Sequence, residues 1–495
     1  MSLSVCADCL SRLRVLNRPK TTYTVPIAAT TFPRVSSFHS SSAAAKNNVL
    51  VKSKKGVKVI PPKHRGSQSA KMKKKVRERP KPPAIGERRA QRHRIVLSNT
   101  NALEVPGMED WSKENMVDVQ NAGHVLGLDG ALLDKLRDCK AFKTTQNWSL
   151  FRRPATLIRS ETIKIGQEMQ DINRSQDTKT VRQLITGERA SGKSILGLQA
   201  MCMAFMNDWL VLNVPEAQEF INNTSSYAPL KQEGTQPQSE QLYIQPHLTQ
   251  ALLTRALHSN EAVLKTLKFN HEFPKHLPLK QGTATLKDLV QLGANDHTFA
   301  WPVWQAFWRE ISEPGAKPRP PVLIVVDGVD HWMGPSKYRS AEYEIVHAHQ
   351  LTLVRQFLGL FFSKPGESRP FANGGALLFS TTGSNSPAYP TFSLLINQLR
   401  ARAQNLDASA PEFPLPAPYS KPDAHVLELM SGTGDVELID LKSLSVAESK
   451  GYMEYFVRSG LLRAKITESS LAELRGLSGG GVVGELAKLG RRARL

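Results

Sequence analysis

The sequence predicts an α/β fold in which helices flank a parallel sheet, and three segments carry this prediction. The run LITGERASGKS at 184–194 places a glycine-rich turn after an apolar stretch. The run PVLIVVD at 321–327 is apolar and ends in an acid, and GGALLFSTT at 374–382 is apolar and ends in hydroxyl residues. Short apolar runs bounded by turns are typical of strands that a parallel sheet buries on both faces. Taken together, the three segments predict a P-loop NTPase of the AAA-like or regulatory switch type. Other parts of the chain, described below, add a predicted C-terminal helical lid and a predicted disordered basic N-terminal extension.

Length and charge suggest a folded body that carries a basic tail. The chain has 495 residues, which is more than one ordinary domain and sufficient for a large core. Its formal charge is +21, but residues 1–95 hold 23 Lys or Arg against three acids. The remaining residues are therefore close to neutral, and the strongly basic surface is confined to the N-terminal tail.

The first 45 residues have the composition of a mitochondrial transit peptide. They are rich in Ser, Thr, Ala and Arg and carry a single acid, Asp8. A disordered cytosolic tail is the alternative. Four scattered cysteines do not form a disulfide framework, which indicates a reducing compartment. Because no run of 18 apolar residues occurs, we expect no membrane span.

Residues 46–100 form the predicted basic extension. Positions 46–95 contain 18 Lys or Arg against two acids, so this segment cannot build a core. Each cation that neutralises a phosphate releases counterions, and the segment is therefore expected to bind RNA in a salt-sensitive, sequence-independent way. The alternative is a solubilising linker. Since the segment lacks aromatic residues, it offers no platform for base stacking.

The nucleotide-binding domain is predicted at 101–400, and its first motif is the phosphate-binding loop. Gly187 is followed by four variable residues and then by Gly192, Lys193 and Ser194. We expect backbone N–H groups of the loop to surround a β-phosphate, Lys193 to reach the β- and γ-phosphates, and Ser194 to hold Mg²⁺. The alternative is an ordinary glycine turn between a strand and a helix. The predicted nucleotide contacts are Gly187, Glu188, Arg189, Ala190, Ser191, Gly192, Lys193, Ser194 and Ile195.

The second half of the predicted site is Asp327, at the carboxyl end of an apolar strand. There it could hold Mg²⁺ through water, beside the phosphate loop. Many hydrolysing relatives have Glu directly after this Asp, whereas this chain has Gly328. Asp330 is the nearest acid that could orient an attacking water, so we expect slow hydrolysis at most. The structural alternative for Asp327 is a strand-ending turn.

A third strand is expected to bring a polar sensor close to the γ-phosphate. The candidates are Thr381, Thr382, Ser384 and Asn385. Between the two halves of the site, residues 221–320 are predicted to form a large insertion. Its aromatic stripe of Trp301, Trp304 and Trp308 is typical of a helix face in the core, with ligand stacking as the alternative.

The C-terminal residues 425–495 are predicted to form a helical lid. In this part SVAE at 445–448 matches a capping box, which marks the start of a helix. The run SGGGVVGELAKL is similar to the glycine turn and helix of AAA-like lids, although an ordinary helical hairpin would have the same pattern. Near the N-terminal side of the domain, residues 148–159 are a candidate for base contacts, with core packing as the alternative.

Over roughly 140–495 the chain resembles the death-associated protein three family of mitochondrial small-subunit ribosomal proteins, in a fungal-looking version. The resemblance rests on GERASGKS, WLVLNVPEA, YIQPHLTQALL, VVDGVDHW and the order of the lid segments. It implies GTP or GDP with Mg²⁺ at the phosphate loop. The sequence itself leaves ATP open, because it contains no NKxD-type guanine signature.

The same resemblance implies a location in the mitochondrial matrix, in the head of the small ribosomal subunit. The implied partners are the small-subunit rRNA and neighbouring mitoribosomal proteins, and family members are also linked to the bridge to the large subunit and to cell death. Two other functions stay open on the sequence: an active P-loop NTPase switch in ribosome assembly or apoptotic signalling, and a mitochondrial ATPase that remodels nucleic acids.

Overall fold

The computed structural model describes most of the chain after the basic N-terminal segment. The described residues are 95–174, 178–230, 240–272, 277–279, 284–363, 370–385, 387–407, 409–419 and 421–492. The predicted transit peptide and nearly all of the basic extension lie outside the described residues. The predicted boundaries at 45 and 46 therefore stay predictions.

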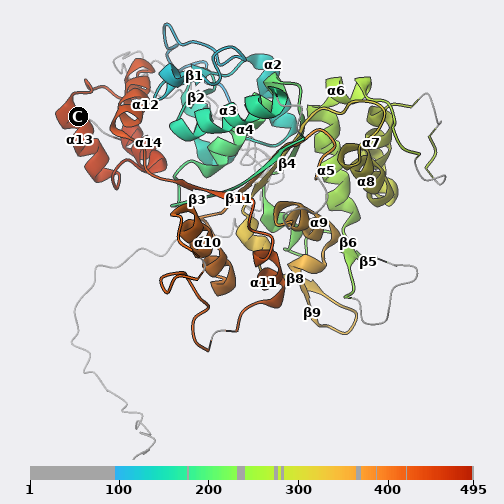
Figure 1. Cartoon of the computed structure of the whole chain (residues 1–495). Coiled ribbons are helices and arrows are strands. Elements are labelled where there is room, and N and C mark those ends of the chain that lie inside the picture. The colour runs from blue at the N-terminus through green and yellow to red at the C-terminus, as the bar shows by residue number, and fades with distance from the viewer. Residues whose placement is uncertain are drawn as a thin grey trace, which may run out of the picture. The chain divides into compact units, whose positions relative to one another are not determined.

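A five-stranded parallel sheet forms the centre of the described chain, in the order β11-β3-β10-β7-β4 (Figure 1). Because all neighbours are parallel, the carboxyl ends of the strands share one edge. The predicted α/β class with flanking helices is confirmed. The strands are β3 (Thr180–Gly187), β4 (Leu210–Val214), β7 (Val322–Asp327), β10 (Gly375–Ser380) and β11 (Val436–Leu441).

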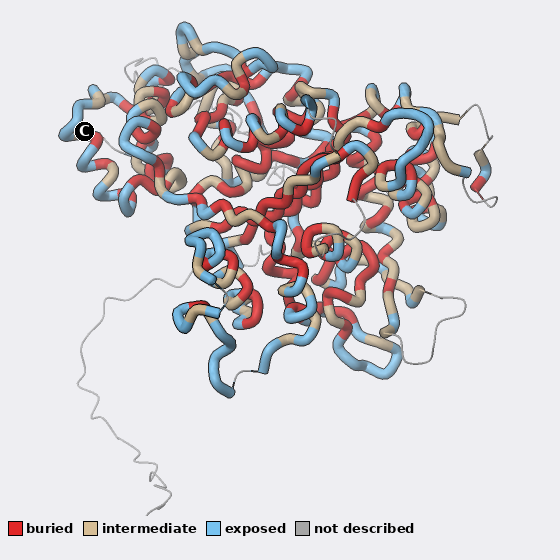
Figure 2. Tube along the Cα trace, in the orientation of Figure 1, coloured by how far each residue is buried: buried red, intermediate tan, exposed pale blue. Residues whose placement is uncertain are grey.

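One face of the sheet is covered by α2 (Gly130–Asp138), α3 (Ser160–Arg174) and α4 (Lys193–Met206), as Figure 1 shows. These helices share one apolar cluster with the sheet, in which α4 is buried along most of its length (Figure 2). A short hairpin of β1 (Val125–Gly127) and β2 (Ala155–Leu157) lies beside them. The residues before the phosphate loop are thus packed against the helix that follows it.

The opposite face carries α9 (Thr352–Phe361), α10 (Pro390–Ala403) and α11 (Ala424–Met430) (Figure 1). A hairpin of β8 (Pro335–Arg339) and β9 (Ile345–His347) leads into α9. Phe357, Phe361 and Phe379 join this side to the sheet in a second, larger cluster.

The predicted insertion 221–320 contains β5 (Ala228–Pro229), β6 (Tyr243–Ile244) and four helices among its described residues. The helices are α5 (Pro246–Ser259), α6 (Glu261–Thr266), α7 (Leu286–Asn295) and α8 (His297–Ser312). They extend the larger cluster beyond edge strand β4, which α5 contacts. Trp304 of α8 is fully buried and donates to Gln356 at 2.8 Å, and Trp301 and Trp308 pack against the same cluster. The core interpretation of the aromatic stripe is confirmed.

The predicted lid segment 425–495 includes two elements that belong to the sheet and its flanking layer: α11, which contacts α10, and β11, which is a strand of the central sheet. It pairs with β3, with Leu441 opposite Gly187. The lid of helices therefore begins later, at α12 (Val446–Arg458), and continues through α13 (Glu468–Leu477) and α14 (Val483–Arg492). Local sequence could not reveal this, since the pairing partner of β11 lies far back in the chain.

The predicted capping box at the start of α12 is confirmed. The Glu448 N–H donates to Ser445 Oγ at 3.2 Å, and the Ser445 N–H donates to the Glu448 carboxylate at 2.8 Å. Among the described helices, none has both the length and the apolar character that crossing a membrane requires.

Candidate functional site

The predicted phosphate loop connects β3 to α4 and adopts a backbone that favours glycine. Gly187 and Gly192 have φ values of 142° and 103°, and Ala190 between them also has a positive φ of 62°. A Cβ atom at Gly187 would lie 2.5 Å from the Leu441 carbonyl oxygen, so only glycine fits beside β11. The first N–H groups of α4 follow directly and lack acceptors inside the helix. The loop is therefore shaped to surround an anion at the positive end of α4.

Lys193 lies folded over the carbonyl groups of this loop. Its Nζ donates to the Gly187 oxygen at 2.8 Å and to the Glu188 oxygen at 2.7 Å. Burial lowers the pKa of Lys193, while the nearby carboxylates of Asp327 and Asp330 act in the opposite direction. Since the contacts within the loop are only to backbone oxygens, the ammonium group is held at the site without a committed anionic partner.

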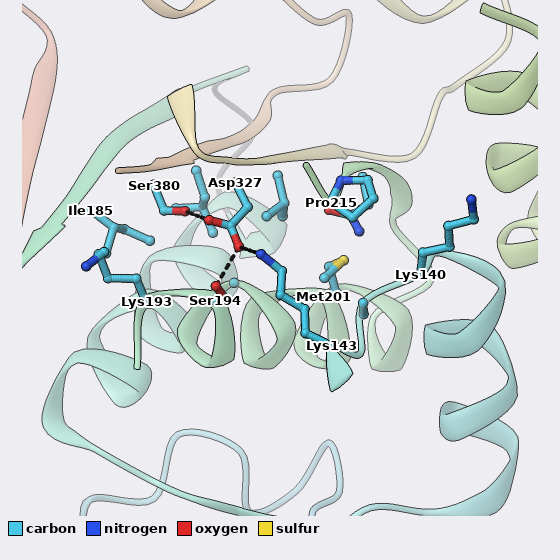
Figure 3. Close-up of a pocket in the computed structure, with 14 residues that line it drawn as sticks. Lys140, Lys143, Ile185, Lys193, Ser194, Met201, Pro215, Asp327 and Ser380 are labelled. Atoms are coloured by element: carbon cyan, nitrogen blue, oxygen red, sulfur yellow. Dashed lines mark hydrogen bonds and ion pairs between the residues drawn. The ribbon is translucent and has the colours of Figure 1, made fainter. Parts of the chain in front are cut away.

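Asp327 is the point on which several side chains converge (Figure 3). Ser194 Oγ donates to its Oδ2 at 2.5 Å, and Ser380 Oγ donates to its Oδ1 at 2.8 Å. The ammonium group of Lys143 forms an ion pair with the same Oδ2. The two predicted Mg²⁺ ligands, Ser194 and Asp327, thus lie in hydrogen-bonding contact, and the Lys143 ammonium group contacts the same carboxylate oxygen.

The parallel register of the sheet explains how these groups meet. Strand β10 separates β3 from β7, and Ser380 is directly opposite Asp327 in the β10–β7 pair and opposite Ile185 in the β10–β3 pair. The surrounding residues, including Lys143 and Ser194, line a cavity of about 20 Å³. A space of this size holds one water or a cation, so a phosphate group would have to lie outside it, over the loop.

Asp330 links the ends of β7 and β10. Gly328, with φ 85°, turns the chain after Asp327, and Asp330 Oδ2 then accepts a hydrogen bond from the Thr382 N–H at 2.5 Å. Burial is the main cause that raises the pKa of Asp330 from 3.8 to about 6. The candidate for orienting water therefore faces the site, but one of its oxygens is engaged by the backbone.

The predicted sensor residues lie on the segment after β10. Thr381 donates its N–H to the Ile185 oxygen at 2.9 Å and is buried against β3. The Thr382 hydroxyl donates to the Ser384 carbonyl at 3.1 Å and accepts from the Ser384 N–H at 3.2 Å. Asn385 is exposed and has φ 52°.

This segment also touches the phosphate loop. A Cβ atom at Gly383 would lie 2.8 Å from the Arg189 Cα, so the two backbones are in close contact. The sensor candidates are therefore next to the loop, although among the hydroxyl residues of this strand it is Ser380 that bonds to Asp327.

Two contacts hold the phosphate loop from outside. The guanidinium group of Arg159 donates to the Ser191 oxygen at 3.2 Å and to the Lys442 oxygen at 3.0 Å, and it lies 3.8 Å from the Glu448 carboxylate. From the lid, the Gly484 N–H donates to the Ala190 oxygen at 3.0 Å. The loop is thus joined to the segment before α3, to the end of β11 and to the first turn of α14.

Trp148, in the segment considered for base contacts, is buried. Its ring meets Phe142 edge to face at 5.1 Å, and its indole N–H donates to Gln146 at 2.8 Å. These are core contacts, whereas Arg159 at the other end of the segment reaches the loop itself.

Sequence reasoning missed Lys143 and Ser380. Ser380 could have been found, because the last residue of a strand beside β7 falls opposite Asp327 in a parallel register. Lys143 gives no such signal in the sequence. It lies at the start of a short 3-10 turn before the phosphate loop and reaches Asp327 because the folded chain brings these two distant segments together.

Comparison with known proteins gives a consistent assignment. Residues 156–489 match the family model described as mitochondrial ribosomal death-associated protein 3. The small ribosomal subunit protein mS29 of Neurospora crassa is 40% identical over 419 residues, which cover 84% of each chain. The mS29 protein of Schizosaccharomyces pombe is 24% identical and covers 75% of this chain and 71% of its own.

Among solved structures, a cryo-EM reconstruction of Hsp104 matches with a TM-score of 0.28 and 11% identity, over 72% of this chain and 46% of that one. This structural similarity is too weak to support a conclusion about fold or function. The family match, by contrast, covers well over half of the chain and includes the loop, Asp327 and the lid helices. The chain therefore belongs to the mitochondrial ribosomal death-associated protein 3 family.

Proposed function

We propose that the chain is a structural component of the mitochondrial small ribosomal subunit that holds a purine nucleoside di- or triphosphate with Mg²⁺ at the phosphate loop. Membership of its family locates the chain at the mitochondrial ribosome, and the relatives it matches are named small ribosomal subunit protein mS29. GTP or GDP is the favoured ligand on family resemblance, with ATP as the alternative.

The observation that carries the nucleotide proposal is the convergence of Lys193, Ser194 and Asp327 at the carboxyl edge of the sheet. The donor set fits Mg²⁺, which prefers hard oxygen ligands such as hydroxyl and carboxylate groups. The backbone fits a phosphate, because the positive φ values of Gly187 and Gly192 open the loop in front of α4. When bound, Mg²⁺ would neutralise phosphate charge beside Ser194 and Asp327.

Two lysines would exchange partners when the nucleotide binds. Lys193 would leave the carbonyl oxygens of Gly187 and Glu188 and reach the phosphates, which are stronger acceptors. Lys143 would give up the carboxylate oxygen of Asp327 to Mg²⁺, since both cations need the same oxygen. Whenever the site holds no nucleotide, Lys143 would therefore act as a tethered substitute for the metal ion.

The site favours retention of the nucleotide over rapid turnover. Gly328 offers no carboxylate directly after Asp327, and Asp330 is bonded to the Thr382 N–H. We therefore expect multiple-turnover hydrolysis to stay below roughly one per second, the low end for ordinary enzymes. A retained nucleotide would stabilise the native state by mass action, as a ligand that binds only the folded chain does.

Contacts to rRNA are proposed for the basic extension, which lies almost entirely outside the described residues. Nearly all of the net positive charge is there, so this extension would supply the salt-dependent part of the interaction. The folded part would contact neighbouring mitoribosomal proteins.

The test compares Lys193→Ala with Lys488→Ala, a lysine on the lid that pairs with Glu485 at the surface. Small subunits are isolated from cells that express each variant, and their nucleotide is released and identified by chromatography. We expect guanine nucleotide with the wild type and Lys488→Ala, and little nucleotide and poor incorporation with Lys193→Ala.

Normal incorporation of Lys193→Ala with an empty site would overturn the structural role of the nucleotide. Sedimentation of the wild-type chain in high-salt gradients tests the ribosomal part separately. Failure to migrate with the small subunit would exclude a stable place in it.

A further inference from the structure

Three histidines from separate segments meet on the face of the sheet that carries α9 and α11, away from the phosphate loop. His347 ends β9, His349 follows in a short 3-10 turn, and His425 is in the first turn of α11. One ring nitrogen of each lies within 4.8 Å of the others. The rings of His347 and His425 are stacked, with centroids 4.3 Å apart, and both meet the ring of His349 edge to face.

His349 presents an unused lone pair to this cluster. The residue is only 6% exposed, and the backbone of Trp332 makes a hydrogen bond to its imidazole. Its Nε2 is buried without a hydrogen-bond partner among the described residues, so Nδ1 must make the bond to Trp332. A neutral ring that donates through Nδ1 therefore keeps its lone pair on Nε2.

This arrangement has the tautomer that metal-bound histidines require. A ligating imidazole usually donates its second N–H to a backbone carbonyl or carboxylate, which fixes the ring and aims the other nitrogen. Left without an ion, the same nitrogen is a buried acceptor with no donor, which is unfavourable.

The other two histidines face carboxylates. His347 Nδ1 accepts the His349 backbone N–H at 3.2 Å, so the neutral ring donates its Nε2–H to Asp423 Oδ2 at 3.1 Å. To bind an ion through Nε2, this ring would move its proton to Nδ1 and release the His349 N–H. His425 Nε2 lies 3.4 Å from Glu240 Oε1. Neighbouring ligands of a tetrahedral Zn²⁺ with bonds of about 2.0–2.1 Å are about 3.3 Å apart, so the three ring nitrogens, which lie within 4.8 Å of one another, would move closer together on binding.

Besides its histidine, each of the carboxylates of Asp423 and Glu240 has a second contact that holds it in place. Asp423 Oδ1 accepts the His425 N–H at 3.0 Å at the start of α11, which leaves Oδ2 for the cluster. The other oxygen of Glu240 lies 3.4 Å from Arg355 of α9, which leaves Oε1. Each carboxylate thus has one oxygen that the fold holds and one that faces a histidine.

We propose that His347, His349 and His425 bind one Zn²⁺, with a carboxylate oxygen of Asp423 or Glu240 as the fourth ligand. Imidazole nitrogens and a carboxylate oxygen are ligands that Zn²⁺ takes in a closed tetrahedral site. The ion would be structural, because it would cross-link the end of the β8–β9 hairpin to α11, and Glu240 as the fourth ligand would add the segment before β6. It is independent of the nucleotide, since none of its ligands belongs to the phosphate loop.

The test uses the full-length chain without a polyhistidine tag and with Cys6 and Cys9 replaced by Ser, because that Cys-x-x-Cys pair could bind zinc by itself. Zinc per chain is measured by mass spectrometry after dialysis against a weak chelator, and Zn²⁺ affinity is measured by competition with a chromogenic chelator. We expect one Zn²⁺ per chain. His349→Ala and His425→Asn should each weaken binding by at least about 100-fold, because loss of a ligand exceeds the 10–100-fold cost of losing an outer-shell partner.

The matched control is His297→Asn, which alters a histidine stacked on His247 outside the cluster and should leave the zinc content unchanged. Asp423→Asn and Glu240→Gln identify the fourth ligand, since only the true ligand should lower affinity as strongly as a histidine variant does. If buried His349→Ala fails to fold, the wild-type chain loaded with Co²⁺ still decides the matter through the strong visible absorption of a tetrahedral site. Absence of zinc from the folded chain, or equal zinc in His425→Asn and His297→Asn, would overturn the proposal.

Discussion

Replacement of Lys143 by Met should strengthen binding of the magnesium nucleotide, although the residue lies inside the proposed site. In the nucleotide-free chain its ammonium group pairs with Asp327 Oδ2, the oxygen that the metal ion needs. If Mg²⁺ displaces the ammonium, the ion pair is present in the free state and absent in the bound state. The substitution then destabilises the free state alone, and the lost free energy appears as a gain in affinity.

The size of this gain follows from the burial of the pair. The side chain of Lys143 is 28% exposed and that of Asp327 is 12% exposed, so the pair lies between the surface and buried classes. Exposed pairs contribute about 0–1 kcal/mol, and removal of one partner from a buried pair costs about 3–5 kcal/mol. A cost of about 2 kcal/mol corresponds to a decrease in Kd of roughly 30-fold.

Titration calorimetry with GDP and Mg²⁺ measures the Kd, and urea unfolding without nucleotide measures the cost to the free chain. Lys140→Met is the matched control, because it removes a neighbouring charge from the same cavity. We expect Lys143→Met to have a lower free energy of unfolding and a lower Kd for the nucleotide, whereas both quantities should change little in Lys140→Met. A Kd that rises tenfold would refute the competition and identify Lys143 as a phosphate ligand.

Three further predictions concern groups around the site and the tail. The pKa of Asp330 is raised to about 6 from 3.8, so its contribution to the free energy of unfolding is full below about pH 3.8 and is lost as the pH rises through about 6. In urea unfolding between pH 4 and 7, Asp330→Asn should therefore lose less free energy of unfolding than the wild type, by up to about 3 kcal/mol. Arg159→Ala should lower the free energy of unfolding by about 3 kcal/mol, because it removes the charged hydrogen bonds to the Ser191 and Lys442 oxygens together with the ion pair to Glu161. Deletion of residues 46–95 should weaken RNA binding and flatten its salt dependence in filter-binding titrations.

Each of these predictions has its own contradicting result. Parallel pH profiles of the wild type and Asp330→Asn would show that the acid is not held in its neutral form. Arg153→Ala, which breaks a more exposed pair with Asp110, is the control for Arg159→Ala, and equal losses would deny the special role of Arg159. An unchanged salt slope after the deletion would place the RNA contacts in the folded part.

The positions of the candidate site residues were predictable from sequence to the extent that strand ends and turns determine them. The glycine spacing predicted a turn between a strand and a helix, and the apolar strand that ends at Asp327 predicted that this carboxylate would lie beside that turn, where it contacts Ser194. Both depend on local patterns together with one general rule, that the carboxyl ends of parallel strands share an edge. The same rule brings Ser380 to Asp327.

The contacts that local pattern does not encode were missed. Lys143 reaches Asp327 from a turn before α3, and β11 joins the sheet beside a strand that comes much earlier in the chain. The histidine cluster has a weak local signal, His347 and His349 two positions apart, but its third member is distant in sequence. Each of these contacts depends on the packing of remote segments, which periodicity and spacing do not report.

The contacts around the loop lead to a final expectation, that GDP and GTP stabilise the chain to a similar extent. Arg159 and Gly484 hold the backbone at Ser191 and Ala190, in the part of the loop that would surround the β-phosphate common to both nucleotides. At 100 times its Kd either nucleotide would contribute about 2.7 kcal/mol by mass action.

The segment expected to sense a γ-phosphate is already engaged in the free chain, through the bonds from Thr382 to Asp330 and to Ser384. A third phosphate therefore gains little from it. Thermal unfolding at one equal concentration of GDP and GTP, well above both Kd values, compares the two nucleotides. If GTP stabilises the chain by more than about 1.4 kcal/mol beyond GDP, a tenfold preference, then the γ-phosphate does order this segment, and the site works as a switch that distinguishes the two nucleotides.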